Sequence, residues 1–113
     1  MITNLTRNTS IAVCHETASN PWQRMKGLLG RRQLAQGHAL LIPRCQSIHM
    51  FFMRFPIDVI FCDKAHRVVG LTRGIKPFRL SPIFFKASYA LELPVGSIAA
   101  SGTQRGDIIA III

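Results

Sequence analysis

Acidic side chains are scarce in this 113-residue chain, which has 5 Asp and Glu against 14 Lys and Arg and a formal net charge of +9. A hydrolase built on paired carboxylates would need two of Asp58, Asp63, Glu92 and Asp107 to converge, and no spacing requires that. The bases are dispersed, with only Arg31-Arg32 adjacent. A basic surface attracts polyanions and acidic partners without identifying a nucleic-acid-binding protein.

Cysteine is also scarce. Cys14, Cys45 and Cys62 form no CxxC pair, so the sequence indicates neither a zinc knuckle nor a disulfide framework. Free, mostly buried thiols in a reducing compartment are the simplest interpretation. The first residues, MITNLTRNTSIAV, lack the basic stretch and apolar core of a secretory signal. We therefore predict a cytoplasmic location.

Several functional motifs are missing. No apolar run approaches the roughly 18–20 residues of a transmembrane helix. The phosphate-binding patterns GxxxxGK[ST] and GxGxxG are absent, as is the GxSxG of serine hydrolases. The sequence therefore predicts no cofactor.

What the chain does have is hydrophobic residues, 49% of the total, in short runs that predict strands. The expected strands cover residues 9–15, 39–42, 47–53, 57–62, 67–72, 88–93 and 108–113, and the expected short helices cover 21–29 and 94–100. A turn over Asp63–His66 predicts a hairpin, although it lacks the usual glycine. The apolar strand 108–113 should lie inside a sheet. We expect one α+β domain over residues 1–113, compact and β-rich, with a barrel-like or strongly curled, mostly antiparallel sheet and two short helices.

The segment Arg54–Asp58 is one candidate site. Pro56 interrupts the strand pattern, and Asp58 alternates with Ile60 and Cys62 on an otherwise apolar face. A carboxylate there needs a partner, because burying it unpaired is costly. The candidate partners are the arginines Arg54, Arg24 and Arg31. The pair either fixes a bend or lines a pocket, in which Asp58 could act as general base and Arg54 as anion clamp.

Cys45, His49 and Met53 form a second, weaker candidate as a set of soft metal ligands. Residues four apart in a strand are about 13 Å apart, too far to hold one ion without a sharp bend. We therefore predict no metal site and interpret His49 as a hydrogen-bonded, partly buried histidine.

Sequence elements in a fixed order extend this interpretation. They are Met25–Arg31, Ala39–Ile42, Ser47–His49, Phe51–Asp58, Leu91–Pro94 and Gly106-Asp107. Over residues 9–113 the chain resembles the small bacterial family known as domain of unknown function 192, and Phe52–Asp58 is the most specific part of the match. The resemblance implies a compact mixed domain rich in strands, without an established activity. Its motif positions are Arg24, Arg31, His49, Met53, Arg54, Asp58, Glu92 and Asp107.

Three functions remain open. The leading hypothesis is a binding module for a small anionic ligand or an acidic protein segment near Arg54–Asp58, with His49, Arg24 and Arg31 as further candidate contacts. The second is an enzyme that uses Asp58 or His49 as general acid or base. The third is nucleic-acid binding through the cationic surface.

Overall fold

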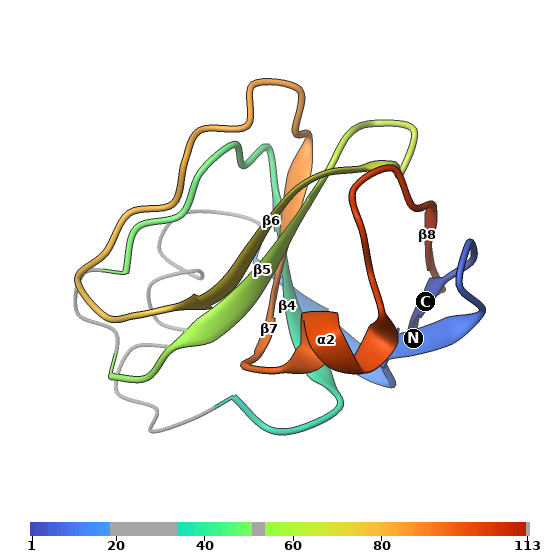
Figure 1. Cartoon of the computed structure of the whole chain (residues 1–113), viewed down its shortest axis with the longest axis horizontal. Helices are drawn as coiled ribbons and strands as arrows, with labels where there is room; N and C mark the ends of the chain where they lie inside the picture. The colour runs from blue at the N-terminus through green and yellow to red at the C-terminus, as the bar shows by residue number, and fades with distance from the viewer. Residues whose placement is uncertain (19–33, 51–53, 113) are drawn as a thin grey trace.

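The computed structural model describes residues 1–18, 34–50 and 54–112, where the chain forms eight strands and one short helix (Figure 1). In chain order these are β1 Ile2–Asn4, β2 Thr9–Ala12, β3 Cys14–Thr17, β4 His38–Pro43, β5 Ile57–Cys62, β6 Val68–Ile75, β7 Tyr89–Pro94, α2 Ser97–Ser101 and β8 Ile109–Ile111. The predicted helix over residues 21–29 lies outside the described residues. Within the described ranges, no helix has the length and apolarity needed to cross a membrane.

The strands form two sheets. The larger has the order β3-β4-β7-β5-β6 and is antiparallel except for the β3–β4 pair, and the smaller has the antiparallel order β2-β1-β8. This confirms a β-rich, mostly antiparallel domain, but the barrel-like alternative is wrong for the described strands. The predicted strand 9–15 breaks at the exposed Val13, so β2 joins the small sheet and β3 the large one.

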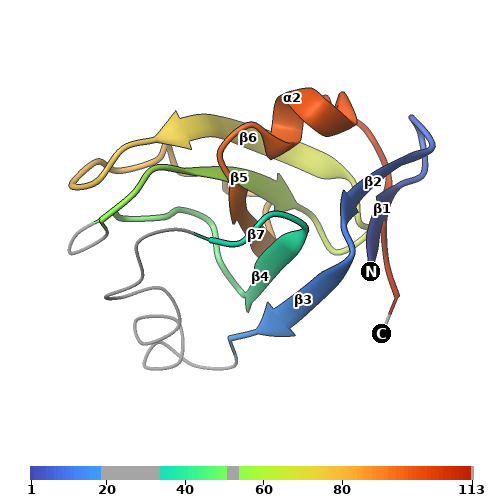
Figure 2. The same cartoon turned by 90° about the horizontal axis from the view of Figure 1, so that it is seen from below.

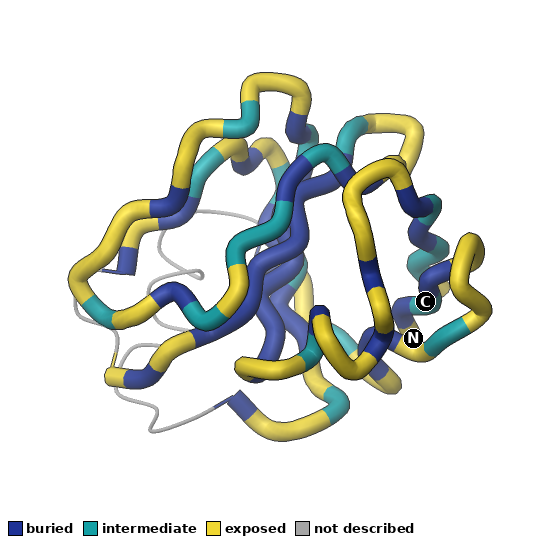
Figure 3. The backbone as a smooth tube through the Cα atoms, viewed as in Figure 1, coloured by how far each residue is buried: buried dark blue, intermediate teal, exposed yellow. Residues whose placement is uncertain are grey.

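The core lies on both faces of the large sheet. Every residue of β5 and β7 is buried (Figure 3). Successive side chains of a strand point to opposite faces, and Val59 and Phe61 join one apolar cluster while Ile60 joins the other. Helix α2 contributes Ile98 to the second cluster, between β5 and the small sheet (Figure 2). A sheet covered on both faces explains why these strands are almost continuously apolar.

The predicted hairpin is confirmed, because β5 and β6 pair across the turn. The Oδ1 atom of Asp63 accepts hydrogen bonds from the backbone N–H groups of Ala65 and Arg67, both at 2.9 Å. His66, at φ 64°, takes the left-handed conformation that a glycine would take more readily. Hydrogen bonds accepted by the Asp63 side chain thus stabilise a turn that lacks the usual glycine.

Two other expectations need correction. The predicted second helix forms but begins at Ser97, because Pro94 still pairs with Ile57 at the end of β7. Residues 47–50 form no strand beyond a bridge from His49 to Leu80, and residues 51–53 lie outside the described part. The facing segment contains Pro77 and Pro82, which donate no backbone hydrogen bond.

The two ends of the chain also differ from expectation. Strand β8 lies at an edge of the small sheet rather than inside it. Strand β1, which the sequence did not predict, lies between β8 and β2, and the Met1 amino group donates to the Ile112 carbonyl at 2.8 Å (Figure 1). Three residues are too few for a period-2 pattern, so only pairing with distant strands fixes β1.

Candidate functional site

Asp58 lies on β5, and its side chain is buried. Its Oδ1 accepts the backbone N–H of Gly74 at 2.8 Å, and its Oδ2 accepts those of Gly96 at 3.1 Å and Ile98 at 2.9 Å. Gly96 precedes α2 and has no side chain to cap it, so Asp58 caps this helix from a neighbouring strand. The carboxylate therefore joins β5, the end of β6 and the start of α2.

The predicted ion pair between Arg54 and Asp58 is wrong. Arg54 is exposed, and among the described residues the only ion pair is the one between Arg7 and Asp107. Arg24 and Arg31 lie outside the described residues. Backbone N–H groups supply the partners that the sequence analysis assigned to arginine, a choice that no residue spacing could reveal.

His49 is exposed, at the bridge to Leu80, rather than partly buried as expected. Cys45 is buried, and Met53 lies outside the described residues. In the described ranges no three His, Cys, Asp or Glu side chains come together as a metal site would require. The nearest approach is a pair on the parallel strands β3 and β4, where the Cys14 Sγ lies 3.2 Å from the His38 Nδ1.

Glu92 is another of the motif positions, within the element Leu91–Pro94. It lies in β7, between Leu40 of β4 and Val59 of β5, and is buried. Its burial shows that this carboxylate does not face solvent.

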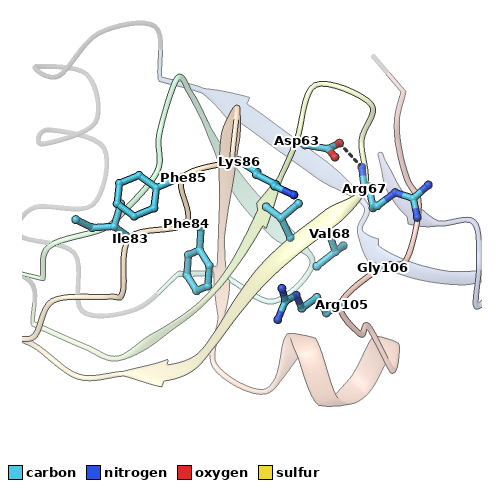
Figure 4. A pocket seen from close by; sticks show the side chains of 10 residues that line it. Asp63, Arg67, Val68, Ile83, Phe84, Phe85, Lys86, Arg105 and Gly106 are labelled. Carbon is cyan, nitrogen blue, oxygen red and sulfur yellow. Dashed lines mark hydrogen bonds between the residues drawn. The ribbon is translucent and has the colours of Figure 1, made fainter.

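A hollow of about 740 Å³ opens elsewhere, at the start of β6 (Figure 4). Its walls are the β5–β6 turn with Asp63 and Arg67, the strand residues Val68 and Val69, the segment 83–86, and the turn 105–106. We call it the basic groove. Its volume falls within the range of roughly 300–1,000 Å³ typical of small-molecule sites.

The apolar floor of the basic groove is fixed by one aromatic side chain. Phe84 turns toward β6, away from Ile83 and Phe85 (Figure 4). Its ring lies 4.6 Å from that of Phe61 between centroids, and a Cβ atom on Gly70 would come within 2.3 Å of it. Gly70 is therefore needed for the ring to lie against the sheet, and the partly buried Val69 beside it extends the apolar surface.

The rim of the groove is basic. Arg67, Lys86 and Arg105 are exposed and come from three separate segments. None of them forms an ion pair with a described residue. The one acid in the lining, Asp63, accepts backbone hydrogen bonds from the turn (Figure 4). Three bases and one acid give the rim a formal charge of +2, and cations without partners suit a ligand that carries negative charge.

A polar cluster lies behind the same turn. The His66 Nδ1 is 2.8 Å from the Tyr89 hydroxyl. Burial raises the pKa of the Cys62 thiol to about 12, against the effect of a hydrogen bond with Tyr89, and the charge of Asp63 raises it further. Burial also raises the pKa of Tyr89. The Cys62 thiol and the Tyr89 hydroxyl therefore stay neutral near pH 7.

The family model described as "Uncharacterized ACR", domain of unknown function 192, matches residues 3–111. The chain belongs to this family. The predicted resemblance is thereby confirmed, and it extends further toward the N-terminus than residue 9.

The relatives of this chain come from a wider range of organisms than expected. A UPF0127 protein of Pyrococcus abyssi is 36% identical over 98 residues, which cover 81% of this chain and 80% of that protein. A UPF0127 protein of Thermococcus sibiricus is 46% identical over 61 residues, 54% of this chain and 39% of the relative. The chain thus spans less than half the length of that relative. Because these relatives are archaeal, the expectation of a bacterial family is too narrow.

Two solved structures share the fold of this domain of unknown function 192. A protein of unknown function from Novosphingobium aromaticivorans superposes with a TM-score of 0.75 at 23% identity, covering 86% of this chain and 74% of that one. A protein from Sinorhizobium meliloti, described as a candidate transcription regulator, gives a TM-score of 0.73 at 27% identity, covering 85% and 79%.

The basic groove was missed in the sequence. Its three bases are separated by up to 38 positions along the chain, from Arg67 to Arg105. The signal available was the aromatic and basic run from Phe84 to Lys86, which loosely resembles a surface for single-stranded nucleic acid but whose phenylalanines fit a core equally well. Its partners are distant in sequence, so only folding brings the groove together.

Proposed function

We propose that the chain is a binding module for a small anionic ligand with an apolar body, and that the ligand occupies the basic groove. The observation that carries the proposal is the set of three cations without ion-pair partners in the described chain, around a hollow floored by Phe84. The net charge of +9 favours encounter with any anion, and the groove supplies a place to hold one.

Each part of such a ligand has a counterpart in the groove. An apolar ring or short chain would pack on Phe84 and Val69, which are both partly buried. A carboxylate or phosphate would accept hydrogen bonds from the Arg105 guanidinium group, which can bind two oxygens at once, and from the Lys86 ammonium group, while Arg67 adds positive charge at the rim (Figure 4). The site thus combines affinity from burial with orientation from charge.

The basic groove is a different site from Arg54–Asp58, which the sequence predicted. Both oxygens of the Asp58 carboxylate already accept backbone hydrogen bonds, which disfavours a role as general base. Arg54 and His49 stay as predicted ligand contacts that the test below can detect. The predicted cytoplasmic location is likewise kept as part of the proposal.

Nucleic-acid binding is a second candidate, favoured by the net charge and by the description of the Sinorhizobium meliloti protein. It requires a salt dependence that steepens with the number of phosphate contacts. A single-stranded oligonucleotide titrated at two ionic strengths tests it: no binding at low salt excludes it.

The test of the proposed function is a titration with 2-naphthoate, followed by NMR amide shifts. Inorganic phosphate and the neutral 2-naphthalenemethanol serve as comparison probes. We expect shifts in residues 67–70, 83–86 and 105–106, and weaker binding of both comparison probes. The double variant Lys86→Gln/Arg105→Gln should bind naphthoate roughly tenfold or more weakly, since two charge-assisted hydrogen bonds are lost.

Arg73→Gln is the matched control, because Arg73 is an exposed arginine of β6 outside the groove lining. This variant should bind naphthoate as the wild type does. Equal weakening by Arg73→Gln would reduce the effect to net charge and overturn the groove proposal. Shifts centred on Arg54 and His49 instead of the groove would overturn it in favour of the site predicted from sequence.

A further inference from the structure

Four large apolar side chains stand exposed within eight residues, between β6 and β7. We call Phe78, Leu80, Ile83 and Phe85 the apolar ridge, and their exposed fractions are 65%, 67%, 57% and 78%. Single exposed apolar residues are common on proteins, but a local group marks an interaction surface. The segment that carries them runs along the outside of the molecule (Figure 1), and Ile83 and Phe85 lie together on its outer side (Figure 4).

The backbone beneath the ridge is held in place. The N–H groups of Phe78, Ser81 and Phe84 donate to the carbonyls of Met50, Ile48 and Gln46 at 2.8, 2.9 and 2.8 Å. Phe78 adopts φ 64°, a conformation that is unfavourable for a bulky side chain. The fold therefore presents these side chains outward at a cost in stability, rather than leaving them on a loose chain.

The ridge is surrounded by positive charge. Between Asp63 and Glu92 the sequence contains six Lys or Arg residues and no acid. Lys76, Arg79 and Lys86 lie within or beside the ridge and are exposed. Apolar side chains next to cations, with no carboxylate among them, match the two layers of an anionic membrane surface, which has acyl chains below negative headgroups.

We propose that the apolar ridge docks this domain on an anionic lipid bilayer, with Phe78, Leu80, Ile83 and Phe85 entering the interface and the neighbouring bases contacting headgroups. All four side chains are more than half exposed, and Ile83 and Phe85 also form an edge of the basic groove, whereas Phe78 and Leu80 do not. An exposed row of this kind suits a planar surface better than a peptide chain would. The predicted cytoplasmic location would expose the ridge to the leaflet that carries anionic lipids. The proposal does not depend on a ligand in the basic groove.

Flotation with lipid vesicles tests the docking. We expect the full chain to float with phosphatidylcholine vesicles that contain phosphatidylglycerol, to float poorly with phosphatidylcholine alone, and to be released by added salt. The double variant Phe78→Ser/Leu80→Ser should lower the partition coefficient roughly tenfold or more, because two buried apolar side chains are lost at the interface. Neither residue lines the basic groove.

Leu5→Ser/Val13→Ser is the matched control, since Leu5 and Val13 are 58% and 62% exposed outside the ridge. It should float as the wild type does, and Arg105→Gln should bind naphthoate more weakly while keeping most of its flotation. Loss of flotation in the Leu5→Ser/Val13→Ser control equal to that in the ridge variant would overturn the proposal. So would absence of flotation at low salt, or a concentration-dependent dimer in sedimentation that Phe78→Ser abolishes, which would assign the ridge to a second copy.

Discussion

Charged side chains have opposite surroundings at the two ends of β6. At the C-terminal end of β6, the Asp58 carboxylate from β5 is buried and accepts hydrogen bonds from three backbone N–H groups. At its start, Arg67, Lys86 and Arg105 surround an apolar hollow without an ion pair to any described residue. A charge whose hydrogen-bonding capacity is filled within the fold contributes to stability, and a charge left without a partner beside a hollow can bind something else. The sequence pattern alone did not separate the two.

The largest expected effect is that of replacing Asp58. Asp58→Ala should lower the free energy of unfolding by about 3 kcal/mol or more, because three backbone donors lose their acceptor at once. Asp58→Asn should cost about 1–3 kcal/mol, since the amide nitrogen cannot accept the hydrogen bonds that a carboxylate oxygen did. Urea unfolding measures both.

Arg54→Gln is the comparison for that prediction. With no ion pair to Asp58, it should change the free energy of unfolding by less than about 0.5 kcal/mol. A loss similar to that of Asp58→Asn would restore the ion pair that the sequence analysis expected and remove the contrast between the two ends.

Prediction from sequence succeeds where a feature depends on neighbouring residues. The hairpin at Asp63, the strands β5 and β7 and the helix that ends at Gly102 all follow from local patterns of apolarity, turn residues and caps. The burial of Asp58 also follows from its apolar neighbours. These features depend on residues within a few positions of one another.

Long-range contacts were beyond the same reasoning. Gly96 is followed by a helix that it cannot cap, and the cap comes from Asp58, 38 residues earlier. The groove depends on Phe84 lying on Gly70, and on bases from three segments. Because many segments could meet a given strand, no local pattern selects the one that does. The partner of a buried charge and the lining of a site therefore became visible only in the fold.

A smaller effect tests the floor of the basic groove. Gly70→Ala should cost about 1–3 kcal/mol, because the new methyl group overlaps the Phe84 ring, which must move as a whole. The variant should also bind naphthoate more weakly than the wild type. In Gly70→Ala/Phe84→Leu the smaller side chain should relieve the overlap, so the two substitutions should cost less together than the sum of their separate effects. Additive costs would mean that Phe84 does not lie on Gly70.

The smallest effect concerns Asp107, another buried carboxylate, and it appears only in acid. Burial opposes ionisation of Asp107, but hydrogen bonds from the Asn4 amide, the Gln104 backbone and the Arg7 guanidinium outweigh it and hold the pKa of Asp107 below its ordinary value. The unfolded chain therefore binds a proton at this group at higher pH than the folded chain does. The resulting stabilisation is complete above the ordinary carboxyl pKa and is lost as the pH falls below about 4. Asp107→Asn should make the decline in urea midpoint between about pH 4 and pH 2 shallower, and Arg7→Gln should do so less, since Asn4 and Gln104 remain as donors. An acid decline identical in all three proteins would show that the Asp107 carboxylate contributes nothing through its charge.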